Sequence, residues 1–73
     1  MKKTIYYVWY QSGDGDIFKG YQNTLTSAHL DKSVANEVAR MNSGWVETEE
    51  DDLHPDYIEQ LERQDADLKA NQL

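Results

Sequence analysis

The sequence contains no cysteine, which excludes both a disulfide framework and a zinc site built from thiolate ligands. It also shows no secretory signal at its start and no apolar run near the roughly 20 residues that a membrane-spanning helix needs. These absences predict a cytoplasmic protein that does not enter a membrane. The chain has 73 residues. We expect one domain with a thin core, because a chain this short buries only about 60% of its unfolded surface.

Basic side chains are half as numerous as acidic ones: seven lysines and arginines stand against fourteen aspartates and glutamates, for a net charge of −7. Such a charge repels nucleic acid and anionic lipid, so neither is an expected direct partner. Residues 1–46 hold four acids and five bases, whereas residues 47–73 hold ten acids and two bases. This asymmetry is typical of an interaction surface or, alternatively, of a solvated helix or a frayed tail.

Residues suited to catalysis or metal binding are few. His29 and His54 are the only histidines, and neither has a metal-ligand spacing. No glycine-flanked serine marks a nucleophile, and the hydroxyls of Thr24, Thr26 and Ser27 suit helix caps better. We therefore expect no enzyme activity, no metal and no cofactor.

Three segments have the composition of β-strands. Residues 4–10 are dense in β-branched and aromatic side chains, which pack well on a pleated surface. Two glycines and two aspartates within residues 12–16 predict a hairpin turn rather than a calcium loop, and a return strand follows at residues 17–22. Residues 45–49 alternate apolar and polar side chains, which predicts a short third strand.

A first amphipathic helix is expected at residues 28–42. Either Ser27 or Asp31 can cap its start, and residues 42–44 supply a left-handed C-cap. Its apolar face consists of Leu30, Val34, Val38 and Met41.

A second amphipathic helix is expected at residues 53–66, where Pro55 suits the first turn. Asp65 interrupts its apolar stripe, so we expect the polar end, residues 67–73, to be frayed. The apolar face consists of Leu53, Tyr57, Leu61 and Leu68, and Asp52, Asp56, Glu59 and Glu62 form an acidic ridge on the opposite side.

The order of these elements predicts an α+β fold with a three-stranded antiparallel or mixed sheet, in strand order 2-1-3. The first strand lies in the centre, because its side chains are apolar on both faces. The crossover helix covers one face of the sheet, and the C-terminal acidic helix is the candidate cover for the other.

The tripeptide His54-Pro55-Asp56 matches the signature through which J-domain co-chaperones engage their Hsp70 partner. J-domains place it after a basic helical segment, whereas acidic residues precede it here. We therefore interpret it as the start of a helix.

The acidic C-terminal third and the many aromatic residues together resemble, in type, the small proteins that phages deploy against host defences. Uracil-DNA glycosylase inhibitor and the DNA-mimicking anti-restriction and anti-CRISPR proteins share this profile. The resemblance implies a cytoplasmic inhibitor, acting in the host cell if phage-encoded, that occupies the nucleic-acid groove of a basic nuclease or CRISPR effector. The candidate partner-binding residues are Trp45, Glu47, Glu49, Glu50, Asp51, Asp52, Asp56, Tyr57, Glu59 and Glu62.

An alternative from a different class is a homodimeric accessory module. In that case the exposed sheet face pairs with a second copy of the chain, and the acidic helix only confers solubility.

Overall fold

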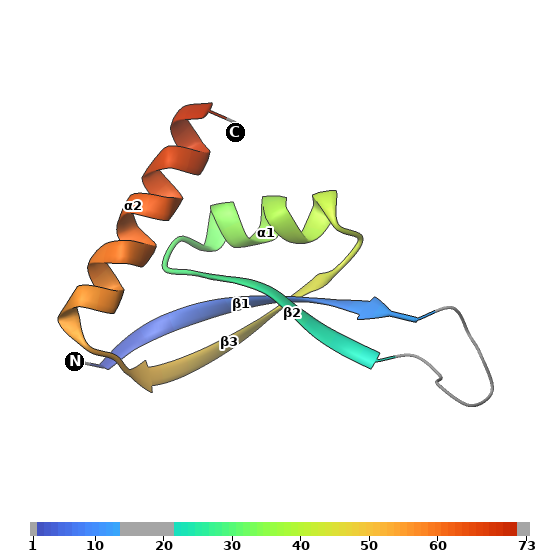
Figure 1. Cartoon of the computed structure of the whole chain (residues 1–73), viewed down its shortest axis with the longest axis horizontal. Helices are drawn as coiled ribbons and strands as arrows, with labels where there is room; N and C mark the ends of the chain where they lie inside the picture. The colour runs from blue at the N-terminus through green and yellow to red at the C-terminus, as the bar shows by residue number, and fades with distance from the viewer. Residues whose placement is uncertain (1, 14–21, 72–73) are drawn as a thin grey trace.

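The computed structural model describes residues 2–13 and 22–71, which form three strands and two helices (Figure 1). The sheet is antiparallel in the order β2-β1-β3, which confirms the predicted α+β fold and its strand order. The elements are β1 (Lys2–Ser12), β2 (Gln22–His29), α1 (Lys32–Met41), β3 (Trp45–Asp52) and α2 (Pro55–Asn71).

The central strand β1 divides the buried side chains into two clusters, because successive strand residues point to opposite faces. Val8 lies on one face and is fully buried against α1. Ile5 lies on the other face and is fully buried beside Ala28 of β2 and Leu61 of α2. The apolar character of β1 on both faces therefore has the predicted cause, since each face receives helical side chains.

Helix α2 covers the second face only in part. It stands at the end of the sheet where the chain begins, next to α1 (Figure 1). Leu61 packs in the cluster of Ile5, whereas Leu68 packs against the cluster of α1. The helix therefore passes from one face to the other, and the part of the second face around Trp9 and Trp45 belongs to neither cluster.

Strand β2 differs most from the sequence prediction. Of the predicted strand 17–22, only Gln22 lies within the described residues. Of the predicted turn at residues 12–16, the structure describes only Ser12, which ends β1, and Gly13. Thr24, Thr26 and Ser27, which we expected as helix caps, belong to β2 instead. Pairing with β1 decides this, because it supplies backbone hydrogen bonds on both sides of Thr26, where a bulge shifts the register between Val8 and Trp9.

Helix α1 begins at Lys32, four residues later than predicted. Asp31 is its N-cap and accepts hydrogen bonds from the backbone N–H groups of Ser33 and Val34, which confirms one of the two predicted starts. Leu30 therefore precedes the helix and packs in the cluster of Ile5. Met41 ends the helix and is 50% exposed, so the expectation that it faces the core was wrong.

The last two elements are both longer than predicted. Strand β3 extends to Asp52, because β1 continues beside it to Lys2. Helix α2 begins at Pro55, where the missing N–H costs nothing, and continues to Asn71. Residues 67–71 of the predicted tail are thus helical. Ile58 is buried in place of Tyr57, which is 43% exposed.

The turn between α1 and β3 supplies a stability test at Gly44. A Cβ atom there would overlap the backbone carbonyl oxygen of Trp9, which cannot rotate away. We expect Gly44→Ala to lower the free energy of unfolding by about 1–3 kcal/mol, measured by urea denaturation. The control is Ser43→Gly in the same turn. Ser43 has a φ of 56°, so glycine there should leave stability unchanged or slightly raise it. Equal losses in both variants would contradict the packing argument.

Candidate functional site

Strand β3 is an edge strand that carries a row of carboxylates. Glu47, Glu49 and Glu50 are exposed, and none of their carboxylates forms a hydrogen bond or ion pair within residues 2–13 and 22–71. Glu47 and Glu49 lie on the same face as Trp45, whereas Glu50 points to the opposite face. The edge therefore has negative charge on both faces of the strand.

At the end of β3, the acidic residues lie opposite basic residues of β1. Asp51 lies opposite Lys3 in the register and Asp52 lies opposite Lys2. Asp51 is half-buried and also accepts a hydrogen bond from the hydroxyl of Tyr7. Asp51 and Asp52, two of the ten predicted binding residues, therefore already have neighbours of opposite charge within the fold. A partner would have to compete with these neighbours.

The hydrogen bond to Asp51 perturbs Tyr7. That bond and burial together raise the pKa of Tyr7 to about 12, with a smaller contribution from the negative charges of Asp51 and Glu49. All of these effects favour the neutral phenol. Ionisation would remove the donated proton, place a charge in a partly buried position and put a second negative charge beside the carboxylate. Tyr7 thereby ties the acidic strand to the centre of the sheet.

An aromatic surface adjoins the acidic strand. Trp9 lies opposite Trp45 on β3 and opposite Leu25 on β2. Both tryptophans are half-buried and Leu25 is 47% exposed. Nε1 of Trp9 is buried and has no hydrogen-bond partner within the described residues. We call these three residues, Trp9, Leu25 and Trp45, the aromatic platform.

The predicted acidic ridge on one helix is not formed, because Asp52 belongs to β3. The remaining members, Asp56, Glu59 and Glu62, are exposed on α2. Glu59 pairs with Arg63 at 2.7 Å between Oε1 and Nη2. The negative potential of α2 is therefore partly offset along the helix, and β3 has the less compensated row.

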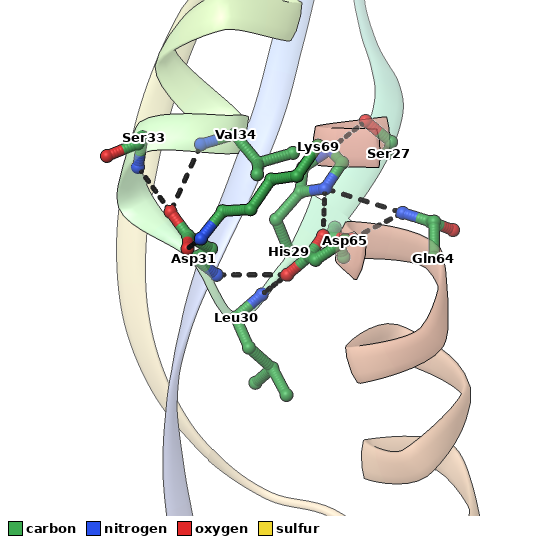
Figure 2. A network of polar contacts seen from close by, with 10 residues as sticks. Ser27, His29, Leu30, Asp31, Ser33, Val34, Gln64, Asp65 and Lys69 are labelled. Carbon is green, nitrogen blue, oxygen red and sulfur yellow. Dashed lines mark hydrogen bonds and ion pairs between the residues drawn. The ribbon is translucent and has the colours of Figure 1, made fainter. Parts of the chain in front are cut away.

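A buried polar network lies at the other edge of the sheet, where sequence reasoning placed no site (Figure 2). Its centre is the pair of His29 and Asp65, with 2.8 Å between Nδ1 of the imidazole and Oδ1 of the carboxylate. His29 is 1% exposed and Asp65 is 5% exposed. Nε2 of His29 lies 2.7 Å from Oγ of Ser27.

The second oxygen of Asp65 binds the turn between β2 and α1. It accepts hydrogen bonds from the backbone N–H groups of Leu30 at 2.9 Å and Asp31 at 3.0 Å. Gln64 donates a further hydrogen bond to the carbonyl of Ala28 at 3.1 Å. Two adjacent residues of α2, Gln64 and Asp65, thus hold the end of β2 by polar contacts. Asp65, which interrupts the predicted apolar stripe, is therefore the residue that anchors the helix.

A charged pair extends the network towards solvent. Lys69 of α2 contacts the carboxylate of Asp31 and, with the backbone N–H groups that Asp31 caps, lowers the pKa of that carboxyl. The same contact raises the pKa of Lys69. An open cleft beside this pair is lined by Leu30, Asp31, Glu62, Asp65, Ala66 and Lys69.

Within residues 2–13 and 22–71, no three histidine or acidic side chains converge as metal ligands, and neither helix is long and apolar enough to span a bilayer. No known family model, curated protein or solved structure matches this chain. Any function must therefore be argued from the residues themselves.

The raised pKa of Tyr7 predicts a pH dependence of stability. A group whose pKa rises on folding from 10.0 to about 12 adds stability that is complete below pH 10 and is lost as the pH increases to about 12. Ultraviolet titration of the folded protein should show a late ionisation step near pH 12, and Tyr7→Phe should remove that step. Tyr57→Phe is the control and should leave it in place. A late step that survives Tyr7→Phe would contradict the assignment.

The anchoring role of Asp65 predicts a large loss of stability on its removal. Asp65→Ala leaves the imidazole of His29 and two backbone N–H groups without their acceptor, at a cost of about 3–5 kcal/mol in urea denaturation. Asp67→Ala is the matched control, because Asp67 is exposed on the same helix. It should change stability by less than about 0.5 kcal/mol. Similar values for the two variants would show that Asp65 does not hold α2.

Proposed function

We propose that this chain is an acidic binding protein that docks β3 and the adjoining aromatic platform on a basic protein surface. The partner we propose is a nuclease or CRISPR effector whose nucleic-acid groove the chain occupies in the cytoplasm. The observation that carries this proposal is the row of exposed, unneutralised carboxylates of Glu47, Glu49 and Glu50 on an edge strand.

An extended edge strand suits such a groove. Side chains on one face of a strand repeat about every 7 Å, so the carboxylates of Glu47 and Glu49 form a regular series along β3. Exposed charge of one sign attracts an oppositely charged surface from a distance and raises the rate of association. Because salt screens exposed charges beyond about 8–10 Å, the complex should form more slowly as ionic strength rises.

The aromatic platform supplies the apolar part of this surface. Tryptophan is enriched among the few residues that carry most of the binding energy in protein interfaces. Trp45 and the two glutamates lie on the same face of β3, so one partner can contact the ring and both carboxylates. A charged rim around an aromatic centre is the usual arrangement of a specific interface.

The second candidate is the homodimeric module, and the exposure of Leu25 within the aromatic platform favours it. Such a dimer would join the sheet faces rather than the β3 edges. Antiparallel pairing of β3 with its own copy would bring glutamates close to one another, which costs energy. Acidic side chains on an edge strand also prevent edge-to-edge aggregation without any partner.

Neutralising the strand tests the proposal. The chain is used to capture partners from a bacterial lysate, and the association rate with a captured basic protein is then measured at several salt concentrations. We expect the double variant Glu47→Gln, Glu49→Gln to lower that rate at least about 10-fold and to flatten its salt dependence. The control removes the same charge elsewhere, in Glu37→Gln, Asp67→Asn.

If both double variants lowered the association rate equally, net charge alone would explain the loss. That result would contradict a site on β3. A salt-independent dimer seen by sedimentation, with no basic protein captured, would favour the homodimeric module instead.

A further inference from the structure

Three side chains at the β2 edge form a serine–histidine–aspartate row. Ser27 and His29 are two residues apart on β2 and therefore point to the same face. Asp65 approaches from α2 on the far side of the imidazole (Figure 2). The distances are 2.7 Å from Oγ of Ser27 to Nε2 of His29 and 2.8 Å from Nδ1 of His29 to Oδ1 of Asp65.

The chemistry of the three groups assigns the protons in this row. An ionised carboxylate can only accept, which favours the tautomer of His29 with its hydrogen on Nδ1, donated to Asp65. In the neutral imidazole, the lone pair on Nε2 then faces Ser27, and the hydroxyl of Ser27 donates to it. Asp65 is itself held by the N–H groups of Leu30 and Asp31, so its carboxylate has a fixed direction.

Of the three groups, Ser27 is the most exposed and His29 the most buried. Ser27 is half-buried, whereas His29 and Asp65 are 1% and 5% exposed. A molecule from solvent therefore reaches the hydroxyl first, and the base behind it is protected from water. A hydroxyl at the surface, a base behind it and a third group that orients the base are the parts of an activated nucleophile.

We propose that Ser27 is a nucleophile activated by His29 as general base, with Asp65 as the positioning residue, and that it reacts with small acyl esters. Oγ of Ser27 forms a bond to the acyl carbon while its proton moves to Nε2 of His29. The bond between the acyl carbon and the alcohol oxygen breaks, and the alcohol leaves with that proton. Water then hydrolyses the acyl-serine by the same proton path and releases the carboxylic acid.

This reactivity is independent of the proposed binding function. Ser27 lies on β2, at the opposite edge of the sheet from β3. Failure of either proposal therefore leaves the other unaffected.

The direct test is labelling of the folded wild-type protein with a fluorophosphonate probe, followed by peptide mass spectrometry. The Oγ–phosphorus bond forms as the phosphorus–fluorine bond breaks, and His29 takes the hydroxyl proton. We expect one adduct, on Ser27, and its loss when the protein is unfolded in urea, because unfolding separates Ser27 and His29 from Asp65. No adduct on Ser27, or equal labelling in urea, would overturn the proposal.

Substitutions identify the base. His29→Gln keeps a polar side chain but removes the base, and it should slow labelling of Ser27 by about 10²-fold or more. Ser27→Ala should abolish the adduct, and Ser33→Ala, at an exposed serine outside the row, should not change it. In Asp65→Asn the amide can reverse the imidazole tautomer, so labelling should fall while heteronuclear NMR still shows a folded protein. Labelling at the wild-type rate in folded His29→Gln would overturn the assignment of the base. Where either variant fails to fold, the wild-type comparison with urea still decides.

Discussion

The carboxylate of Asp65 determines how the second helix meets the rest of the molecule. An ionised group with so little exposure is stable only when protein groups replace the water around it. His29 and the N–H groups of Leu30 and Asp31 do so here. Asp31 in turn caps α1, so one network joins the end of β2, the start of α1 and the middle of α2. These polar contacts supplement the few apolar side chains that α2 buries.

The topology could be predicted because it depends on local signals. The two-faced apolar pattern of β1 and the helical spacing of Val34 and Val38 are visible in short windows of sequence, and the predicted order of strands was confirmed. The boundaries of β2 could not be predicted in this way. Hydroxyl residues such as Thr24 and Ser27 suit a helix cap and a strand equally well, and only the pairing with β1 decides between them.

The two candidate sites also differ in how far the sequence could predict them. The acidic row of β3 is contiguous in sequence, so composition was enough to select Glu47, Glu49 and Glu50. Its geometry was not predictable, because the split over two faces depends on strand pairing. The row at the other edge joins His29 to Asp65, which are 36 residues apart. Sequence reasoning saw an isolated histidine and a misplaced aspartate, since the signal that connects them is their distance in the fold.

The two edges of the sheet thus differ in their polar groups. The β3 edge carries exposed carboxylates, and the β2 edge carries a largely buried, hydrogen-bonded row. The hydrogen-bonded row requires α2 to be docked through Asp65. The acidic row requires β3 to be paired with β1 along its full length. Hydrogen exchange of the backbone amides of Leu30 and Asp31 tests the docking most directly. These two N–H groups should exchange only on global unfolding, because Asp65 accepts from both. Exchange at the rate of exposed amides would contradict the account.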